Sequence, residues 1–313
     1  MPHLFVVLNW GRGHATRSIP LIQNLINEGK EVVLGADGEV KNILQDQFPQ
    51  LKMEILPSLN FKSGSHVARS ILFHLPNFMV WFIRDYIWMR RNKYRFSKVI
   101  SDGRLSMAFA ASKMAIFINH QWGGDFRTIY GLFVLALTHF CAKAKFEIWF
   151  PGNPEYWPWT VGDQLKMKYT GPLSSISVFP VRKNTLDFCI SLSGPPAAQD
   201  HLLQTLLPIL EHRQLSFSVL GYGGSKFPFP GFISGNKRDE LWSSSKAVVG
   251  FFGYSTLMDI MANNKKAILL AINGQWEQEF LLKNIRFDDQ IFGLHQNEVN
   301  LKSKLEEIIT LRI

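Results

Sequence analysis

Two strand–turn–helix units, one in each half of the chain, constrain the fold more than any other feature of the sequence. Leu4–Leu8 is an apolar run typical of a buried strand, and the glycine turn Gly11–Gly13 follows it. Ser18–Ile26 then repeats its apolar residues at helical spacing, with Pro20 in the first turn, and Glu31–Gly35 is a second strand. This order is a βαβ unit, which predicts a parallel sheet.

The second half repeats this organisation after an irregular stretch. Residues 149–180 are rich in proline and glycine, so we expect a domain boundary at their end, between domains 1–180 and 181–313. Phe188–Leu192 is the next predicted strand, and Asp200–Glu211 is a predicted helix, broken or kinked near Pro208. A length of 313 residues suits one large domain or two ordinary ones, and the repeated organisation favours two. The sequence therefore predicts an α/β protein with two Rossmann-like domains that face each other across a cleft.

The first glycine turn carries a candidate general base. Five residues lie where the first strand passes into the first helix, an edge at which open parallel sheets bind ligands: Gly11, Arg12, Gly13, His14 and Arg17. A histidine there titrates near neutral pH and is able to accept a proton from a hydroxyl group. The alternative interpretation is phosphate binding by the turn, with His14 bonded to the backbone.

The motif Ser101–Arg104 follows another predicted strand of the same half. Asp102 either orients the base or caps the helix that comes next. Arg17 and Arg104 either meet a phosphate or pair with Asp102. His120 lies after the next strand, where it either faces the ligand or is a core histidine.

A second glycine turn, at Gly253, leads into a helix with Ser255 and Thr256 in its first turn. The N–H groups and the positive dipole end of such a helix suit a diphosphate. Asp259, one turn further on, is able to accept hydrogen bonds from ribose hydroxyls. A later polar loop supplies amide and carboxylate groups for a sugar: Gln275, Glu277 and Gln278.

At these residues the chain resembles the glycosyltransferases of the GT-B fold, in particular the family 28-like group that includes the N-acetylglucosaminyl transferase of peptidoglycan synthesis. The motifs that carry the resemblance are Gly11–Arg17, Ser101–Arg104, Asn119–Gln121, Ser193–Pro195, Gly253–Asp259 and Gly274–Gln278.

The resemblance implies an enzyme of the hexosyltransferase type that transfers a sugar from a nucleotide-diphosphate donor, usually with uridine, to an acceptor hydroxyl. His14, with Asp102, would be catalytic, and the reaction would be inverting and need no metal or other cofactor. The donor would be held by Ser193, Gly194, Gly253, Tyr254, Ser255, Thr256, Asp259, Gln275, Glu277 and Gln278. The acceptor, a lipid-linked molecule or a polysaccharide, would be faced by Gly11, Arg12, Gly13, Arg17, Arg104 and His120.

The sequence departs from the motifs of this group at three places, and two other functions for the same architecture stay open. Pro196–Asp200 lacks an arginine that would face phosphate, Gly152 replaces a carboxylate, and Phe251–Phe252 replaces a more polar pair. A sugar-nucleotide epimerase would release an isomer without an acceptor. A protein that binds a sugar nucleotide without catalysis would tolerate the losses.

The net charge of +9 and the 13% aromatic content favour an anionic partner. Residues 71–96 mix aromatic and basic residues, which suits either an anionic membrane surface or a core helix with a solvated basic end. With no signal peptide and no membrane span expected, we predict a cytoplasmic protein, peripheral on the inner face of the membrane. Nucleic acid is not an expected partner, because the basic residues are dispersed. The two cysteines and the histidine spacing indicate neither a disulfide framework nor a metal site.

Overall fold

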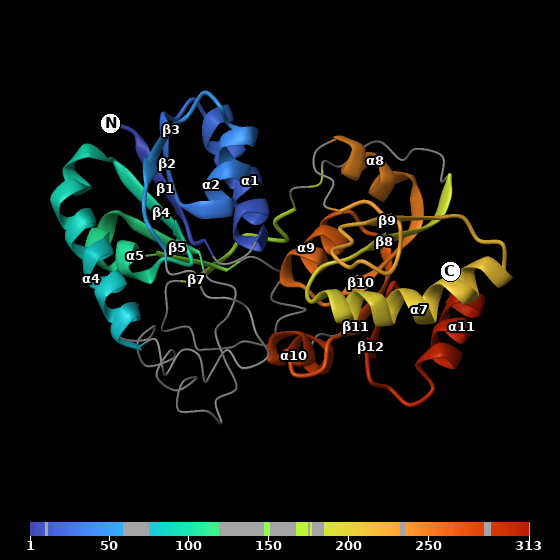
Figure 1. Cartoon of the computed structure of the whole chain (residues 1–313). Helices are drawn as coiled ribbons and strands as arrows, with labels where there is room; N and C mark the ends of the chain where they lie inside the picture. Colours follow the sequence, from blue (N-terminus) through green and yellow to red (C-terminus); the bar gives the residue numbers. More distant parts are fainter. Residues whose placement is uncertain are drawn as a thin grey trace. The chain divides into compact units, whose positions relative to one another are not determined.

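The computed structural model describes residues 1–9, 12–58, 75–118, 147–150, 167–174, 176, 185–231, 236–284 and 289–312. These residues form two compact units, the first ending at residue 174 and the second beginning at Ile176 (Figure 1). Each unit is a parallel sheet flanked by helices, which confirms the predicted α/β class. The predicted boundary at residue 180 lies outside the described residues.

The first unit contains a seven-stranded sheet in the order β3-β2-β1-β4-β5-β6-β7, and every neighbouring pair is parallel. Its strands are β1 (His3–Val7), β2 (Val32–Ala36), β3 (Lys52–Ile55), β4 (Lys98–Asp102), β5 (Ala115–Ile118), β6 (Glu147–Phe150) and β7 (Met167–Tyr169). The central strands are buried along nearly their whole length because helices cover both faces, which explains their continuous apolar sequences.

Helices α1 (Arg12–Asn27) and α2 (Gly38–Gln47) lie on one side of this sheet in Figure 1, and α4 (Leu75–Asn92) and α5 (Leu105–Ala111) lie on the other. Single 3-10 turns at Lys93–Arg95 and Ser112–Met114 follow the last two. The core beside α1 contains Phe5, Ile22, Leu34 and Ile100, all 2% exposed or less. Nothing in the described segments is both long enough and apolar enough to form a membrane-spanning helix.

Helix α1 begins earlier than predicted. It starts at Arg12 rather than Ser18, so Pro20 lies inside the helix and not in its first turn. A proline removes one helical hydrogen bond, but burial of Leu21 and Ile22 on the sheet keeps the helix continuous. His14 therefore lies on the first turn of a helix rather than on a glycine loop.

The second unit contains a five-stranded parallel sheet in the order β12-β11-β10-β8-β9. Its strands are β8 (Leu186–Ser191), β9 (Phe217–Leu220), β10 (Ser245–Phe251), β11 (Lys266–Ala271) and β12 (Ile291–His295). Its helices are α7 (Pro196–His212), α8 (Asn236–Ser244), α9 (Tyr254–Ala262), α10 (Trp276–Asn284) and α11 (Leu301–Arg312).

Helix α7 corrects the predicted break at Pro208. The helix is continuous from Pro196 to His212, and it starts four residues before the predicted Asp200 because Pro196 suits a first helical position. Leu206 and Leu210 on either side of Pro208 are fully buried in the core of this unit, and their packing outweighs the lost hydrogen bond.

Each sheet has a point at which the strand order reverses. In the first unit the chain runs from β1 outward to β3 and then returns to the other side of β1 with β4; in the second unit the corresponding pair is β8 and β10. Open parallel sheets bind ligands beyond the carboxyl ends of the strands at this point. Those ends carry Asp102 and the start of α1 in the first unit, and Gly194 and Gly253 in the second.

Candidate active site

A buried carboxylate lies at the reversal point of the first sheet. Asp102, the last residue of β4, is completely buried and accepts hydrogen bonds on both oxygens. Arg17 donates to Oδ2 from Nε at 2.7 Å and to Oδ1 from Nη2, while Ser18 Oγ donates to Oδ2 at 3.0 Å. Arg17 is itself only 3% exposed, so the two charges compensate each other inside the protein.

The same carboxylate holds His14. Nδ1 of His14 lies 2.9 Å from Oδ1 of Asp102, and Nη2 of Arg17 also approaches Nδ1. We assign the proton to Nδ1, because the ionised carboxylate 2.9 Å away only accepts hydrogen bonds. This tautomer leaves the lone pair of the ring on Nε2, the nitrogen that a general base would use.

The surroundings set the charges of both groups. Burial by itself would raise the pKa of Asp102, but the charge of Arg17, the proximity of His14 and their hydrogen bonds outweigh it and hold that pKa far below its ordinary range. Burial and then the charge of Arg17 lower the pKa of His14, against the opposing effect of Asp102. At neutral pH the pair is therefore a carboxylate beside an uncharged imidazole.

Gly103 lets the imidazole rest against the backbone of the turn after β4. Its φ of +74° is in the left-handed region, and a Cβ at this position would lie 2.7 Å from Cε1 of His14. Only glycine fits both the conformation and the contact. The capping role considered for Asp102 is wrong, since Arg104 is the N-cap residue of α5 and Asp102 binds α1 instead.

Arg104 does not pair with Asp102, which corrects one prediction for it. It is completely buried and binds Asp85 of α4, with Nε to Oδ2 at 3.0 Å and Nη2 to Oδ1 at 2.7 Å. Its remaining N–H groups donate to the carbonyl oxygens of Leu56 and Pro57 and to Ser58 Oγ. All five N–H groups are thus used within the unit, which leaves none for the acceptor contact predicted for Arg104.

The other residues predicted on the acceptor side lie apart from this cluster or outside the described residues. Arg12 is exposed and pairs with Glu39 of α2 at 2.6 Å. Gly13 accepts a hydrogen bond from Thr16 Oγ1 through its carbonyl oxygen. Gly11 and His120 lie outside the described residues.

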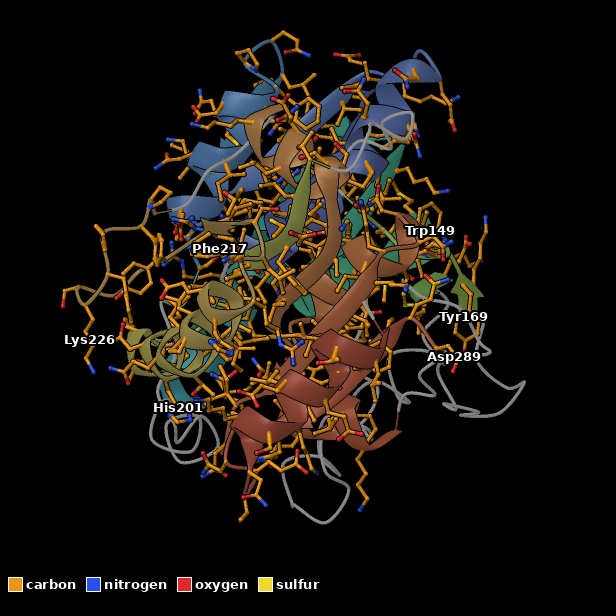
Figure 2. The ribbon with its side chains drawn as sticks, turned by 90° about the vertical axis from the view of Figure 1, so that its right-hand side faces the viewer. Trp149, Tyr169, His201, Phe217, Lys226 and Asp289 are labelled. Atoms are coloured by element: carbon orange, nitrogen blue, oxygen red, sulfur yellow. The ribbon has the colours of Figure 1, made fainter. Side chains whose placement is uncertain are left out.

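The sequence gives Trp149, Trp157 and Trp159 two alternative roles, namely stacking on a sugar or packing near the predicted domain boundary. Trp149 (labelled in Figure 2) lies on β6. Nζ of Lys168, on the neighbouring strand β7, lies 5.3 Å from the centre of its ring, and Glu147 Oε1 accepts a hydrogen bond from its Nε1. These contacts support packing for Trp149. Trp157 and Trp159 lie outside the described residues.

The start of α9 lies at the reversal point of the second sheet. Gly253 is its N-cap residue, with a φ of −90° and a ψ of 141°, and its carbonyl oxygen accepts the first helical bond from Leu257. The next N–H groups belong to the first turn, where a helix has no internal acceptors for them. Tyr254 is buried, whereas Ser255, Thr256 and Asp259 are partly exposed and able to meet a ligand.

The predicted sugar loop follows β11 and is built around Gln278. This residue is 7% exposed; its Oε1 accepts from the N–H of Ile272 and its Nε2 donates to Gln275 Oε1, both at 2.9 Å. Gln278 therefore holds the loop together and orients Gln275. Glu277 is partly exposed at the start of α10.

The turn at Ser193 and Gly194 is exposed after β8, and Gly194 has a φ of +83°. Gln199 secures it, since its Nε2 donates to the Gly194 carbonyl oxygen and its Oε1 accepts from the N–H of Gly223. The sequence identified residue 199 only as a departure where an arginine was expected. Its amide links the loops that follow β8 and β9, a role that an arginine, which has no acceptor atom, could not fill.

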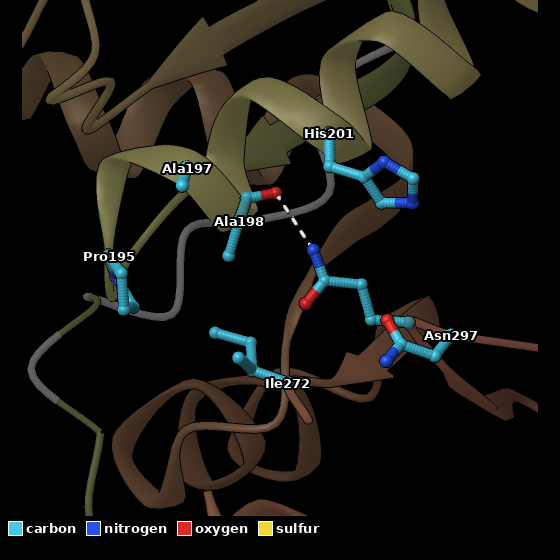
Figure 3. A pocket seen from close by; sticks show the side chains of 7 residues that line it. Pro195, Ala197, Ala198, His201, Ile272 and Asn297 are labelled. Atoms are coloured by element: carbon cyan, nitrogen blue, oxygen red, sulfur yellow. Dashed lines mark hydrogen bonds between the residues drawn. The ribbon is translucent and has the colours of Figure 1, made fainter. Parts of the chain in front are cut away.

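A shallow recess of about 310 Å³ adjoins this turn (Figure 3). It is lined by Pro195, Ala197, Ala198, His201, Ile272, Gln296 and Asn297. Ile272 also contacts Gly194, because a Cβ on that glycine would lie 3.1 Å from its Cδ1. The recess is thus continuous with the turn after β8.

The described residues meet the requirements of neither a metal site nor a reactive thiol. Within the described ranges, no three His, Cys, Asp or Glu side chains are arranged to hold a metal ion. Cys189 is buried in β8, and burial raises the pKa of its thiol to about 12, so it is an inert core residue.

The chain is similar to known proteins in its structure, but its sequence matches none of them. No family model and no curated protein matches the sequence. UGT89C1 of Arabidopsis thaliana, solved with UDP-L-rhamnose, is similar over 99% of this chain and 90% of that chain, with a TM-score of 0.66 and 13% identity. SnogD of Streptomyces nogalater covers 100% and 95%, with a TM-score of 0.61 and 14% identity. MurG of Acinetobacter baumannii covers 99% and 90%, with a TM-score of 0.61 and 11% identity. The chain thus has the GT-B fold of these glycosyltransferases over its whole length.

Proposed function

We propose that the protein is a glycosyltransferase of the hexosyltransferase type, which transfers a sugar from a UDP-linked donor to an acceptor hydroxyl with inversion and without a metal. The observation that carries this proposal is the buried Asp102–His14 pair at the reversal point of a GT-B fold. A second such point carries the open helix start at Gly253. The first domain would bind the acceptor and the second the donor.

In the proposed reaction, Nε2 of His14 takes the proton of the acceptor hydroxyl. The acceptor oxygen forms a bond to the anomeric carbon of the sugar while the bond from that carbon to the diphosphate oxygen breaks. A single displacement of this kind inverts the anomeric carbon. Asp102 stabilises the imidazolium that forms, because its negative charge lies 2.9 Å from Nδ1.

The negatively charged diphosphate, the leaving group of the reaction, would bind at the start of α9. Backbone N–H groups of the first turn, with the hydroxyls of Ser255 and Thr256, suit its oxygens, and the helix dipole favours the negative charge. Such fixed dipoles do the work that a cation does in other transferases. Asp259 would bind the ribose, and Gln275 and Glu277 the sugar, with Gln278 as their support.

The structural neighbours lend support at a general level. Structures of UGT89C1 contain UDP-L-rhamnose, UDP or quercetin, which are a sugar nucleotide, a nucleotide and an aromatic compound with hydroxyl groups. A nucleotide-sugar donor and a hydroxyl acceptor are therefore the partners we propose.

A thermal-shift screen of nucleotide sugars, followed by product analysis, tests the function. We expect UDP and one UDP-sugar to raise the melting temperature, since a ligand that binds only the folded state stabilises it. Consumption of donor should then require an acceptor. Release of an isomeric sugar nucleotide without acceptor would identify an epimerase, and binding with no turnover across an acceptor panel would identify a binding protein.

We also propose that the protein works at the inner membrane surface, with α4 as the contact. Four apolar side chains on one face of this helix are 42% to 58% exposed, namely Met79, Val80, Ile83 and Ile87. Arg84, Arg90 and Arg91 are exposed beside them, while the helix's acidic residue, Asp85, is buried against Arg104. An apolar stripe with cations at its side suits an anionic bilayer.

Vesicle flotation tests this location. We expect co-flotation with vesicles containing phosphatidylglycerol and little with pure phosphatidylcholine. Neutralising Arg84, Arg90 and Arg91 to Gln should weaken binding about 100-fold, at about 1 kcal/mol per charge. A control with three exposed lysines of the second unit changed to Gln (Lys226, Lys237 and Lys302) carries the same change in charge. Equal flotation of wild type and the arginine variant would contradict the proposal.

A further inference from the structure

The turn after β4 is fixed at three consecutive residues, each by a different partner. Asp102 accepts from the N–H of Leu8 through its carbonyl oxygen, and Gly103 donates its N–H to Ile118 at 3.2 Å. The carbonyl oxygen of Arg104 accepts from Ser101 Oγ at 2.8 Å, which closes the turn. His14 contacts this turn twice, through the carboxylate of Asp102 and the backbone of Gly103.

The Arg104 side chain joins the turn to helix α4. Asp85 of that helix receives two of its N–H groups, and the ring of Trp81, also on α4, lies 5.3 Å from the guanidinium carbon. Trp81 Nε1 in turn donates to the Pro57 carbonyl oxygen, which Arg104 also binds. Ser106 Oγ donates to Asp85 Oδ2 at 2.9 Å. Groups within the described residues thus accept hydrogen bonds from all five N–H groups of Arg104.

Stability alone gives little reason for such a cluster. Replacing a buried ion pair by apolar side chains of similar volume often leaves stability unchanged or improves it, because both charges had to be desolvated. The pair instead fixes the orientation of the Arg104 guanidinium. Its five N–H groups lie in one plane and bind acceptors on α4 and on the segment after β3.

We propose that Arg104, held by Asp85, is a positioning residue for the His14 base, which it serves by fixing the turn against which the imidazole rests. Gly103 lies directly before Arg104, so a displacement of Arg104 moves the backbone that touches Cε1 of His14. The carboxylate of Asp102, one residue earlier, moves with it. A displacement of about 1 Å at a reacting group is enough to reduce turnover about 100-fold. This inference rests on the proposed function of His14.

The test uses a double variant, Asp85→Leu with Arg104→Met, which removes both charges together. Arg104→Lys is the conservative variant, because lysine keeps the ion pair but is unable to hold the three oxygen acceptors in the same plane. Tyr222→Phe is a control that removes a hydroxyl of the second unit, which donates to Asp200 and accepts from the N–H groups of Lys226 and Phe227, and it leaves the first unit unaltered. Thermal melting measures folding of each variant.

The main measurement is NMR titration of the His14 ring, assigned with a His14→Gln variant, since it needs no substrate. Among the residues that the structure describes, the charged groups that face this ring are Arg17 from its own helix and Asp102 from β4, and both are present in every variant compared. In the double variant we expect the pKa of His14 to rise toward 6.5, because burial is the largest cause that lowers it. Arg104→Lys should lie between the double variant and the wild type, and Tyr222→Phe should match the wild type.

Turnover of a UDP-sugar should fall at least about tenfold in the double variant with little change in KM for the donor. An unchanged His14 titration in a folded double variant would overturn the proposal. If that variant does not fold, the same result in Arg104→Lys would overturn it. Absence of transfer by the wild type would instead refute the proposed function, and the titration would still decide whether Arg104 positions the ring.

Discussion

Nδ1 of His14 lies 2.9 Å from Oδ1 of Asp102, although 88 positions of sequence separate the two residues. The contact arises because β1 and β4 are neighbours at the point where the strand order reverses, so the start of α1 and the end of β4 meet. Both side chains are shielded from water, which makes their mutual orientation a fixed property of the unit. In the proposed reaction, a histidine held in this way accepts the proton at Nε2.

Changing His14 to Ala should abolish most transfer without loss of donor binding. A general base contributes about 10²- to 10⁴-fold to the rate, so kcat should fall by at least about 100-fold. Asp102→Asn should cause a loss in the same range, since an amide no longer stabilises the imidazolium. The measurement is steady-state turnover together with UDP binding by calorimetry. Full activity of His14→Ala would rule out this residue as the base.

The free energy of unfolding should depend on pH through Asp102. Its pKa in the folded state is lowered from an ordinary value of 3.8, so its contribution is complete above about pH 4 and is lost as pH falls toward the folded-state pKa. Asp102→Asn, which leaves Arg17 buried without its counter-charge, should lower the free energy of unfolding by about 3–5 kcal/mol at pH 7. Urea unfolding between pH 7 and pH 3 should show this difference shrinking below about pH 4. A constant difference would contradict the assignment.

The acid limb of the pH–rate profile should lie below pH 6.5. Burial and the charge of Arg17 lower the pKa of His14, and only the uncharged ring acts as a base. As pH falls through that lowered pKa, His14 takes up a proton and kcat/KM declines. The same pKa should appear in an NMR titration of the free protein. A limb above pH 6.5 would indicate that another group is the base.

Gly103→Ala should harm both folding and catalysis. The left-handed φ of +74° costs an alanine about 1–2 kcal/mol, and its methyl group would lie 2.7 Å from Cε1 of His14. The ring must then move away from Asp102. We expect a lower melting temperature and a loss of kcat greater than the loss of stability explains. Gly29→Ala, also at a positive φ but with open space around it, is the control for strain alone.

The positions of His14 and Asp102 could be predicted from the sequence because Asp102 ends one strand and His14 begins the helix that follows another, and parallel strands place their carboxyl ends together. The same rule located Gly253 and Gly194. Partners on other elements followed no such rule. Arg104 is two positions from Asp102 in the sequence, yet it turns to α4, where Asp85 lies on the buried face of an otherwise apolar and basic helix. A single acidic residue on a buried helix face needs a buried cation as its partner. The position of Asp85 in the sequence therefore indicates such a partner, although it does not identify Arg104.

Gln278 shows a second limit of prediction from sequence. Its type and loop suit a sugar contact, but the tight turn after β11 leaves the N–H of Ile272 needing an acceptor, and Gln278 supplies it. Gln199 is the same case at the turn after β8. A polar side chain next to a turn serves the backbone or a ligand according to geometry that only the folded chain defines.

Gly253→Asp should separate donor binding from stability. The position has an ordinary φ of −90°, and a Cβ there would meet Thr256 Oγ1 at 3.4 Å, an ordinary contact, so a side chain is accommodated. Aspartate is a favoured N-cap residue, and the melting temperature should be unchanged or higher. Its charge would occupy the N–H groups that the diphosphate needs and repel the ligand, so UDP should bind at least about tenfold more weakly. Gly253→Asn caps the helix without the charge and should lose much less. Equal UDP affinity in the Asp variant and the wild type, measured by calorimetry, would move the diphosphate site away from α9.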